Sequence, residues 1–341
     1  MPLTVEAVDT RTASEEHLRE LHRLHVQREH DEKPDDPPVP WERRLAGWRR
    51  PRADADLRHW VAWDGGTALG TAGSYAHATQ NLENAELWVW VDPEARGRGV
   101  ARDLWTPMFD HLEADGRVRV DTFILVDRPE EALAERAGLK RVYTERLSRA
   151  VMAEVDRGLL EEWVAQAHER AAGYSLLRLD NPIPEEYVQR FCTVTNLMHT
   201  APKEDAVEED VFTTPEDWAE WERSFEIRGV DFHALVAVED ATGHWAGYTA
   251  IGRESSMPWG LEQWDTAVDP DHRNKGLGRW LKAALFLEIA ERYPEAQWID
   301  TWNADSNEAM LNINIAMGFR PYWTGSSWQG MTADVRRALG A

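Results

Sequence analysis

The chain has 341 residues, a formal net charge of −23 and one cysteine, Cys192. Its acidic balance argues against nucleic acid and anionic membranes as partners, the single cysteine excludes an internal disulfide, and no stretch reaches the roughly 20 apolar residues that span a bilayer. With no signal-peptide pattern at the N-terminus, we expect a soluble cytoplasmic protein of two domains, since roughly 100–200 residues per domain is typical.

The first half of the chain alternates strand-like and helix-like apolar patterns. A short strand over 3–8 precedes a helical pattern that starts at Ser14, whose side chain is suited to an N-cap. A Trp-rich helix over 41–49 follows, and then a hairpin around the turn at 64–66. A further strand enters a Gly-rich turn, a helix leaves it, and another strand is expected over 118–126.

The second half repeats this order of elements. A strand over 174–179, a helix over 184–196, a helix over 218–227, a hairpin over 234–250 and a strand over 298–302 recur around a second Gly-rich turn. An internal duplication explains this agreement most simply.

Apolar residues at helical spacing connect the two halves. They predict an amphipathic helix over 156–172, packed between the halves rather than forming a loose linker. The expected organisation is therefore an N-terminal domain over 1–155, an inter-domain helix over 156–172 and a C-terminal domain over 173–341.

Each half carries one Gly-rich turn between a strand and a helix, Val91–Ala101 in the first and Val268–Gly278 in the second. Such a turn leaves backbone N–H groups unpaired at a helix N-terminus, where the helix dipole also favours an anion. The two turns therefore predict two phosphate-binding sites. A dinucleotide fingerprint would instead follow the first strand, and the Gly-Lys-Ser/Thr of a Walker loop does not occur in the sequence.

The spacing Arg-x-x-Gly-x-Gly/Ala after a strand resembles the coenzyme A pyrophosphate loop of the GCN5-related N-acetyltransferase (GNAT) family. The matching residues are Arg96, Gly99 and Ala101 in the first half and Arg273, Gly276 and Gly278 in the second. The resemblance covers nearly the whole chain. It implies two tandem acyl-CoA N-acyltransferase domains of mixed α/β (α+β) fold, laid out as in two-domain members such as mycothiol synthase.

The same resemblance implies acetyl-CoA as co-substrate. The residues expected to hold it are Ala267, Val268, Arg273, Asn274, Lys275, Gly276, Leu277, Gly278, Arg279, Asn303 and Asn307, with Arg96, Gly97, Arg98, Gly99 and Ala101 as the corresponding set in the first half.

A second family element follows the next strand. In the family, an Asn eleven residues before the Gly of a Gly-Phe pair contacts the pantetheine arm, and Asn307 occupies that place before Gly318. Asn303 and Asn307 would alternatively serve as helix caps. The first half has Asp127 eleven residues before Gly138, which is a poorer partner for an amide-rich arm.

Family members often place a general-base Glu eleven residues before the first Arg of the loop. This count reaches Glu262 in the second half and Ala85 in the first. Glu86 is adjacent to Ala85, but a shift of one residue turns a strand side chain to the other face, so we expect it to be a poor substitute. Asp265 is an alternative base, expected on the face opposite Glu262 because it lies three positions further along the strand.

Many family members also supply a Tyr four residues before the Gly of Gly-Phe, as the acid for the departing thiolate. That place holds Asn314 in the second half and Ala134 in the first. An amide donates a hydrogen bond but no proton at neutral pH, so either Asn314 suffices, or Tyr322 acts, or the thiolate leaves unassisted. The oxyanion is expected near the backbone N–H of Ala267 or Val268. We therefore expect catalysis in the second half and a structural or regulatory first half.

These residues predict an acetyl-CoA-dependent N-acetyltransferase in which a primary amine of a small molecule attacks the thioester directly. The acidic stretch over 203–217, where an acceptor loop would lie, favours a cationic acceptor. Two alternatives stay open: a coenzyme A-binding or sensing protein without catalysis, and a protein N-acetyltransferase. We expect no metal, since the His residues of the first helix form no His-Glu-x-x-His pattern, and either a monomer or a homodimer.

Overall fold

The computed structural model describes residues 3–50, 55–200, 205–207 and 209–341. No helix in these residues is long and apolar enough to cross a membrane. Contacts divide the chain into two compact units. Unit 1 consists of Met1–Tyr143, Asp205–Val211 and Gly325–Ala341, and unit 2 of Thr144–Glu204 and Phe212–Thr324.

Unit 1 is built on a mixed sheet with the strand order β1-β2-β3-β4-β5-β12, in which β4 and β5 are parallel and the other pairs are antiparallel. Its elements are β1 (Thr4–Ala7), α1 (Glu15–Glu32), α2 (Trp41–Arg49), β2 (Ala55–Asp64), β3 (Thr67–His77), β4 (Asn84–Val91), the 3₁₀ turn η1 (Pro93–Ala95), α3 (Val100–Ala114), β5 (Arg119–Leu125), α4 (Pro129–Arg136), part of β12 (Arg320–Met331) and α10 (Thr332–Leu339).

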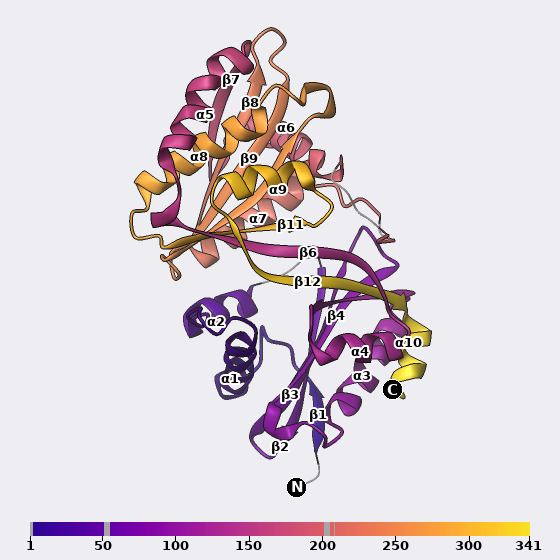
Figure 1. Ribbon diagram of the computed structural model, residues 1–341. Coiled ribbons are helices and arrows are strands. Elements are labelled where there is room, and N and C mark those ends of the chain that lie inside the picture. Colours follow the sequence, from indigo (N-terminus) through magenta and orange to yellow (C-terminus); the bar gives the residue numbers. More distant parts are fainter. Residues whose placement is uncertain (1–2, 51–54, 201–204, 208) are drawn as a thin grey trace. The chain divides into compact units, whose positions relative to one another are not determined.

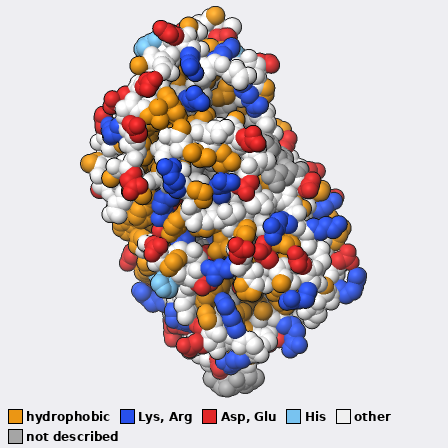
Figure 2. Space-filling view, viewed as in Figure 1, with side chains coloured by type: hydrophobic (Ala, Val, Ile, Leu, Met, Phe, Trp, Pro, Cys, Tyr) orange, Lys and Arg blue, Asp and Glu red, His pale blue; other side chains and the backbone are white. Residues whose placement is uncertain are grey.

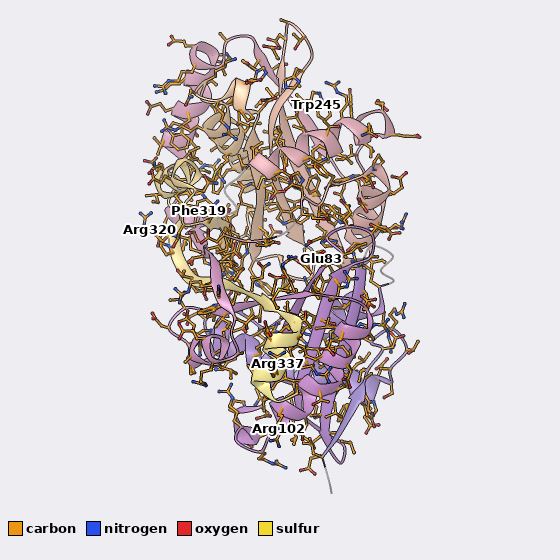
Figure 3. The ribbon with its side chains drawn as sticks, turned by 90° about the vertical axis from the view of Figure 1, so that its right-hand side faces the viewer. Glu83, Arg102, Trp245, Phe319, Arg320 and Arg337 are labelled. Atoms are coloured by element: carbon orange, nitrogen blue, oxygen red, sulfur yellow. The ribbon has the colours of Figure 1, made fainter. Side chains whose placement is uncertain are left out.

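Helices cover both faces of this sheet (Figure 1). Leu104 and Met108 of α3, one helical turn apart, are fully buried against the sheet on one face, together with Val335 of α10. The exposed side chains of Arg102 on α3 and Arg337 on α10 mark the outer surface of that helical layer in Figure 3. Helices α1 and α2 belong to a separate apolar cluster with Trp63 of β2.

Unit 2 has the corresponding strand order β6-β11-β10-β9-β8-β7, with β10 and β11 parallel. Its elements are β6 (Lys140–Val151), the turn η2 (Met152–Glu154), α5 (Arg157–Arg170), β7 (Tyr174–Asp180), α6 (Glu185–Thr195), the turn η3 (Asn196–Thr200), α7 (Pro215–Arg228), β8 (Val230–Glu239), β9 (Trp245–Glu254), β10 (Gly260–Val268), the turn η4 (Pro270–His272), α8 (Leu277–Arg292), β11 (Trp298–Ala304), α9 (Glu308–Ala316) and the start of β12.

The sheet of unit 2 has two distinct apolar faces. Leu261 and Ile299 belong to a buried cluster with α5 and α8, and this side is called the α8 face below. Phe232 and Tyr248 belong to a second cluster with Phe191 of α6 and the aromatic residues of α7, and this side is called the α7 face. The helices lie on these two sides of the strands in Figure 1.

The last strands of the two halves of the sequence are exchanged: β6, from the first half, pairs in unit 2, and β12, from the second half, pairs in unit 1. Residues 145–151 of β6 pair with β11 in unit 2, whereas Gly325–Met331 of β12 pair with β5 in unit 1. The C-terminal helix α10 follows β12 and packs on α3. The compact units therefore differ from the halves at 1–155 and 173–341, which remain the predicted limits of the sequence repeat.

The mixed α/β fold expected from the sequence is confirmed, and so are its elements. Ser14 caps α1 by accepting from His17 N, and Thr214 opens α7 with a capping box to Asp217. The connecting helix forms as α5, where buried Leu160 and Ala167 join the core of unit 2. Its expected packing between the halves stays a prediction. Acidic and basic side chains are interspersed on the face drawn in Figure 2.

Candidate active site

The two Gly-rich turns fold alike. Gly99 and Gly276 are in the left-handed region at φ 86° and 78°, and each is the N-cap residue of the following helix, α3 or α8. Two residues earlier, Gly97 and Asn274 are also left-handed, at φ 77° and 65°, and Asn is among the residues that tolerate this conformation best. No described side chain caps either helix. The first-turn N–H groups of both helices are therefore available to an anion.

The loop arginines close the turn rather than extend from it. Arg273 donates from Nε to the Val268 carbonyl at 3.1 Å, and Arg96 makes the same bond to Val91 at 3.3 Å. Arg273 also donates to Thr200 Oγ1 at 2.8 Å. These contacts hold the strand end against the turn, so the conserved geometry of the two copies includes the arginine side chain.

The other charged residues of the loops also have partners within the protein. Lys275 Nζ donates to Tyr174 OH at 2.6 Å, and the Arg279 guanidinium lies 5.3 Å from the Trp163 ring centroid. In the first copy Arg98 donates to Asp64 at 3.1 Å. The predicted coenzyme contacts of these side chains stay predictions.

A β-bulge interrupts β10 beside this turn. Gln263 pairs with Ile251 and Thr266 pairs with Thr249, so both Trp264 and Asp265 lie opposite the single residue between those partners, Ala250. Buried Gln263 compensates for the lost ladder bond, because its Nε2 donates to the Ala250 carbonyl at 2.7 Å.

The bulge brings Glu262 and Asp265 to one face of β10. Trp264 joins the apolar cluster of the α7 face, and Glu262, two residues before it, points the same way. Asp265 accepts from Tyr248 OH on that face at 3.0 Å. The expectation that Asp265 points away from Glu262 is therefore wrong, since the extra residue restores its direction.

The two carboxylates differ in environment. Asp265 is solvent-accessible but crowded by protein, and desolvation raises its pKa despite the Tyr248 hydrogen bond, which lowers it. Glu262 is exposed, and no described residue forms an ion pair with it. Glu262 is therefore an exposed carboxylate, and Asp265, on the same face of β10, is a partly desolvated one.

The first half lacks the bulge, so the residue of β4 that corresponds to Glu262 lies one position closer to the Gly-rich turn. Strand β4 pairs with β3 without a register shift as far as Glu86. Glu86 pairs in parallel with Asp121 just as Glu262 pairs with Asp300. Ala85 is buried on the α3 side. Glu86, not Ala85, is thus the register counterpart of Glu262, and the expectation that it faces the wrong way is incorrect. Burial raises the pKa of Glu86.

Strands β10 and β11 separate next to the Gly-rich turn. Their parallel pairing ends at Gln263 and Thr301, so the backbone of Ala267 and Val268 has no β11 partner on that side. Ala267 itself is buried against the α7 face. This free strand edge is where the oxyanion contact was expected.

The predicted pantetheine residues form their own hydrogen bonds. Asn307 caps α9 by accepting from Met310 N at 3.3 Å, which is the alternative role considered for it. Asn314 Nδ2 donates to Asn303 Oδ1 at 2.5 Å. The Asn314 side chain is buried, and its Oδ1 has no hydrogen-bond partner among the described residues. A buried acceptor without a donor is costly, and an amide N–H of a ligand would satisfy it.

Tyr322 belongs to a stacked cluster next to Glu262. The Arg149 guanidinium lies 4.1 Å from the Tyr322 ring centroid and 4.5 Å from that of Trp298. Arg149 also forms a bidentate pair with Asp300, both bonds being 2.7 Å. Since Asp300 is the parallel partner of Glu262, this cluster borders the α7 face at Glu262.

Strand β6 adds an acid that sequence reasoning missed. Glu145 pairs with Ala304, four residues along the strand from Arg149, so both side chains point to the α7 face. Burial raises the pKa of Glu145 to about 7. The sequence repeat could not assign Glu145 to the site of unit 2, because β6 belongs to the first half of the sequence.

The acidic connection divides between the two units. Residues 205–207 and 209–211 belong to unit 1, where the Val207 carbonyl accepts from Asn84 at 2.8 Å and from Gln329 at 3.0 Å. Residues 212–217, with Glu216 and Asp217 in the first turn of α7, belong to unit 2. The expected acceptor loop of the second half is not formed by the residues in unit 1 and stays a prediction for 212–217. Residues 203, 204 and 208 of the stretch lie outside the described residues.

A family model described as the acetyltransferase (GNAT) family matches residues 16–139 and 195–313. The chain belongs to this family. Two matched segments in one chain make it a tandem GNAT protein and an acyltransferase, as the duplicated loops predict. No curated protein sequence is similar enough to count as a relative.

Solved structures share the tandem fold. A tandem GNAT protein from the clavulanic acid biosynthesis pathway has a TM-score of 0.77 and 22% identity, covering 97% of this chain and 99% of that chain. A GCN5-related N-acetyltransferase from Sphaerobacter thermophilus has a TM-score of 0.67 and 14% identity, covering 97% and 96%. A glucosamine N-acetyltransferase region of a fungal multi-domain β-N-acetylglucosaminidase has a TM-score of 0.68 and 12% identity, and the match covers 97% of this chain and 38% of that chain. At these identities the likeness shows the fold.

Acetyl-CoA, the co-substrate of the GNAT family, fits the residues of unit 2. The uncapped first turn of α8 suits a diphosphate, the edge between β10 and β11 is open, and Asn314 Oδ1 offers a buried acceptor. The labelled Phe319 and Arg320 in Figure 3 mark the turn from α9 into β12 that bounds this region.

Proposed function

We propose that the protein is an acetyl-CoA-dependent N-acetyltransferase that modifies a primary amine of a small molecule at the site of the second half. The observation that carries this proposal is the β10 bulge, which directs Glu262 and Asp265 to one face. Both carboxylates lie beside the point where β10 and β11 separate, on the strand that leads into the Gly-rich turn. A base on this strand and an anion site in the turn after it are what direct acyl transfer needs.

Glu262 acts as the general base in this mechanism. Its carboxylate takes a proton from the acceptor amine, directly or through one water, and the amine nitrogen attacks the thioester carbonyl. The new C–N bond forms, the C–S bond breaks and the coenzyme leaves as a thiolate. A backbone N–H at Ala267 or Val268 supports the oxyanion, and the spare Asn314 amide hydrogen or Tyr322 assists the thiolate, unless it leaves unassisted.

A cationic acceptor is supported by the acids of the α7 face. Glu262, Asp265 and Glu145 all point to this face. Carboxylates on one face attract an ammonium group and orient it for loss of a proton. We place the acceptor amine on the α7 face for this reason.

Substitution of the base tests the mechanism. We expect Glu262→Gln to lower kcat about 10²- to 10⁴-fold, the usual range for loss of general-base catalysis, with the KM for acetyl-CoA unchanged. Asp265→Asn should mainly raise the KM for the amine. Glu169→Gln, an exposed acid on α5, is the matched control. Equal rates for Glu262→Gln and the wild type between pH 6 and 9 would exclude Glu262 as the base.

A coenzyme A-sensing protein is the second candidate. It is favoured by Asn314, which stands where the family often has an acid and already donates to Asn303. Calorimetry with acetyl-CoA, combined with a thiol-release assay over small amines and peptides, distinguishes the two functions. Tight binding without turnover on any acceptor would favour sensing, and turnover on peptides alone would favour protein acetylation.

A further inference from the structure

Two histidines and an aspartate converge beside the Gly-rich turn of unit 2. His244 precedes β9, and Asp269 and His272 border η4. Their ligand atoms all lie within 4.8 Å of one another. His244 Nε2 lies 2.9 Å from Asp269 Oδ2, and the two imidazole rings are stacked with centroids 4.9 Å apart. Imidazole nitrogens and a carboxylate oxygen are the donor set that zinc and similar ions prefer.

The repeat in the chain provides an internal comparison for this cluster. Asp92 in unit 1 corresponds to Asp269, and both cap the following 3₁₀ turn through a backbone N–H at 3.0 Å. The fold therefore explains the aspartate in both units. The positions of His244 and His272 correspond to Thr67 and Ala95 by the register of the two hairpins. The fold does not require histidine at either place.

His272 is already oriented by neighbouring side chains. Its Nδ1 lies 2.7 Å from Tyr174 OH, with the two rings perpendicular, and Lys275 Nζ donates to the same hydroxyl. A hydrogen bond at one ring nitrogen of a metal-binding histidine fixes the ring and directs the other nitrogen toward the ion. Nε2 of His272 has no hydrogen-bond partner among the described residues and is the nitrogen that remains for the ion. This arrangement matches the outer partners of metal sites.

The local charge is suitable for a cation. Asp269 is a carboxylate within the cluster, and the partly buried Glu239 at the end of β8 interacts electrostatically with His244 and His272. The cations near these acids in the described part of the chain include Lys275 and Arg190, and Arg190 is engaged with the Gly243 carbonyl and the Trp245 ring. His244 is exposed, and a shift of its side chain would bring the three ligand atoms to the distances of about 2.0–2.2 Å typical of zinc.

We propose that His244, Asp269 and His272 form a binding site for one divalent transition-metal ion of the zinc class. Three protein ligands leave a coordination position for water or another oxygen ligand. Because His244 precedes β9 and the other two residues flank or end η4, the ion joins the hairpin to the first part of the Gly-rich turn. The site is independent of the acyl-transfer proposal.

Metal binding to the full chain without a polyhistidine tag tests the site. After treatment with EDTA, equilibrium dialysis against ZnCl₂ should load one ion per chain above the level of the double substitution of both histidines. His244→Ala and His272→Ala should each weaken binding on the order of 100-fold, and Tyr174→Phe about 10-fold, as for an outer partner. His168→Ala, an exposed histidine on α5, is the matched control. Asp269 is left intact because it caps η4.

A second measurement separates loss of the site from loss of the fold. Co²⁺ should give a visible absorption band that both histidine substitutions remove, and Zn²⁺ should raise Tm in the wild type and His168→Ala only. His244→Gln and His272→Gln, with unchanged circular dichroism, repeat the test in a folded chain. Stoichiometric zinc binding that neither histidine substitution weakens would overturn the proposal, and so would the absence of binding in the wild type.

Discussion

Lys282 illustrates how one residue can oppose the stability of its own core. It lies on α8 with 1% of its surface exposed, and its Nζ is 5.6 Å from the Phe319 ring centroid. Removing an ammonium group from water is costly, and burial lowers the pKa of Lys282 to about 7. At neutral pH the desolvation of Lys282 therefore lowers the free energy of unfolding, and an apolar side chain of the same length would remove this cost.

We expect Lys282→Met to stabilise the protein at pH 7 by a few kcal/mol, since each pKa unit corresponds to roughly 1.4 kcal/mol. The folded pKa of about 7 is below the unfolded value of 10.5, so the unfolded chain binds more protons between these values. Wild-type stability should rise with pH in this window, and the variant should lack this rise. Urea unfolding at pH 7 and 9.5 measures it. Lys140→Met, at an exposed lysine, is the control, and equal pH slopes for Lys282→Met and the wild type would contradict the account.

Glu145 gives a prediction of opposite sign. Its folded pKa of about 7 is above the unfolded value of 4.5, so the carboxylate destabilises the fold. This cost is absent below pH 4.5 and complete above about pH 7. Glu145→Gln should therefore stabilise by on the order of 1 kcal/mol at pH 8, allowing for its partial exposure, and change little at pH 5. Thermal unfolding at both pH values checks this, with Glu169→Gln as control; a gain of equal size at pH 5 and 8 argues against it.

At the scale of single elements, the bulge in β10 decides which side chains share a face. The stretch before the Gly-rich turn predicts a strand, but period-2 reasoning assumes one residue per partner. The extra residue turns every later side chain of β10 to the other face, so Asp265 was assigned to the wrong face. Because β4 has no such bulge, counting back the same number of residues in the first half reached Ala85, and Glu86 was also assigned to the wrong face. The polar residue in an otherwise buried strand position, Gln263, was the available signal. Its counterpart in β4 is Leu87, where no bulge forms.

Gln263→Leu should therefore weaken both stability and activity. It leaves the Ala250 carbonyl without its donor, which costs about 1–3 kcal/mol for a buried polar group. If the strand relaxes by losing the bulge, Asp265 also turns away from Glu262. Chemical unfolding and the kcat of amine acetylation report the two effects, and Gln189→Leu on the exposed side of α6 is the control. A variant with wild-type unfolding and activity would show that Gln263 does not support the bulge.

At the scale of the molecule, the repeat predicts the elements well but not their partners. Strands, helices and both Gly-rich turns follow from local periodicity and turn chemistry, and the expected helix over 41–49 matches α2 (Trp41–Arg49). The exchange of β6 and β12 is invisible to such reasoning. Both strands have the same position in their repeats, so local pattern does not decide whether each pairs within its own half. Consequently Glu145, supplied to unit 2 by the first half, could not be assigned from the sequence.

The exchange predicts that a chain cut between its halves stays in one piece. With a protease site inserted between Ala153 and Glu154, both exposed, β6 would remain with the first fragment but paired to β11 in unit 2. Likewise, Gly325–Met331 of β12 would remain with the second fragment but paired to β5 in unit 1. Each fragment would thus supply a strand to the other unit's sheet, with full ladder hydrogen bonding and, through α10, an apolar helix face on α3.

We therefore expect the cut protein to elute from gel filtration at the volume of the intact chain and to separate only in denaturant. A matched insertion in the turn after β8, at 240–243, cuts within unit 2 and shows whether any single nick is tolerated. Two separate peaks under native conditions, from a chain whose uncut form is folded, would mean that each half keeps its own last strand. The exchange would then be wrong, and Glu145 would no longer belong to the acceptor face, which makes this experiment a check on the proposed site as well.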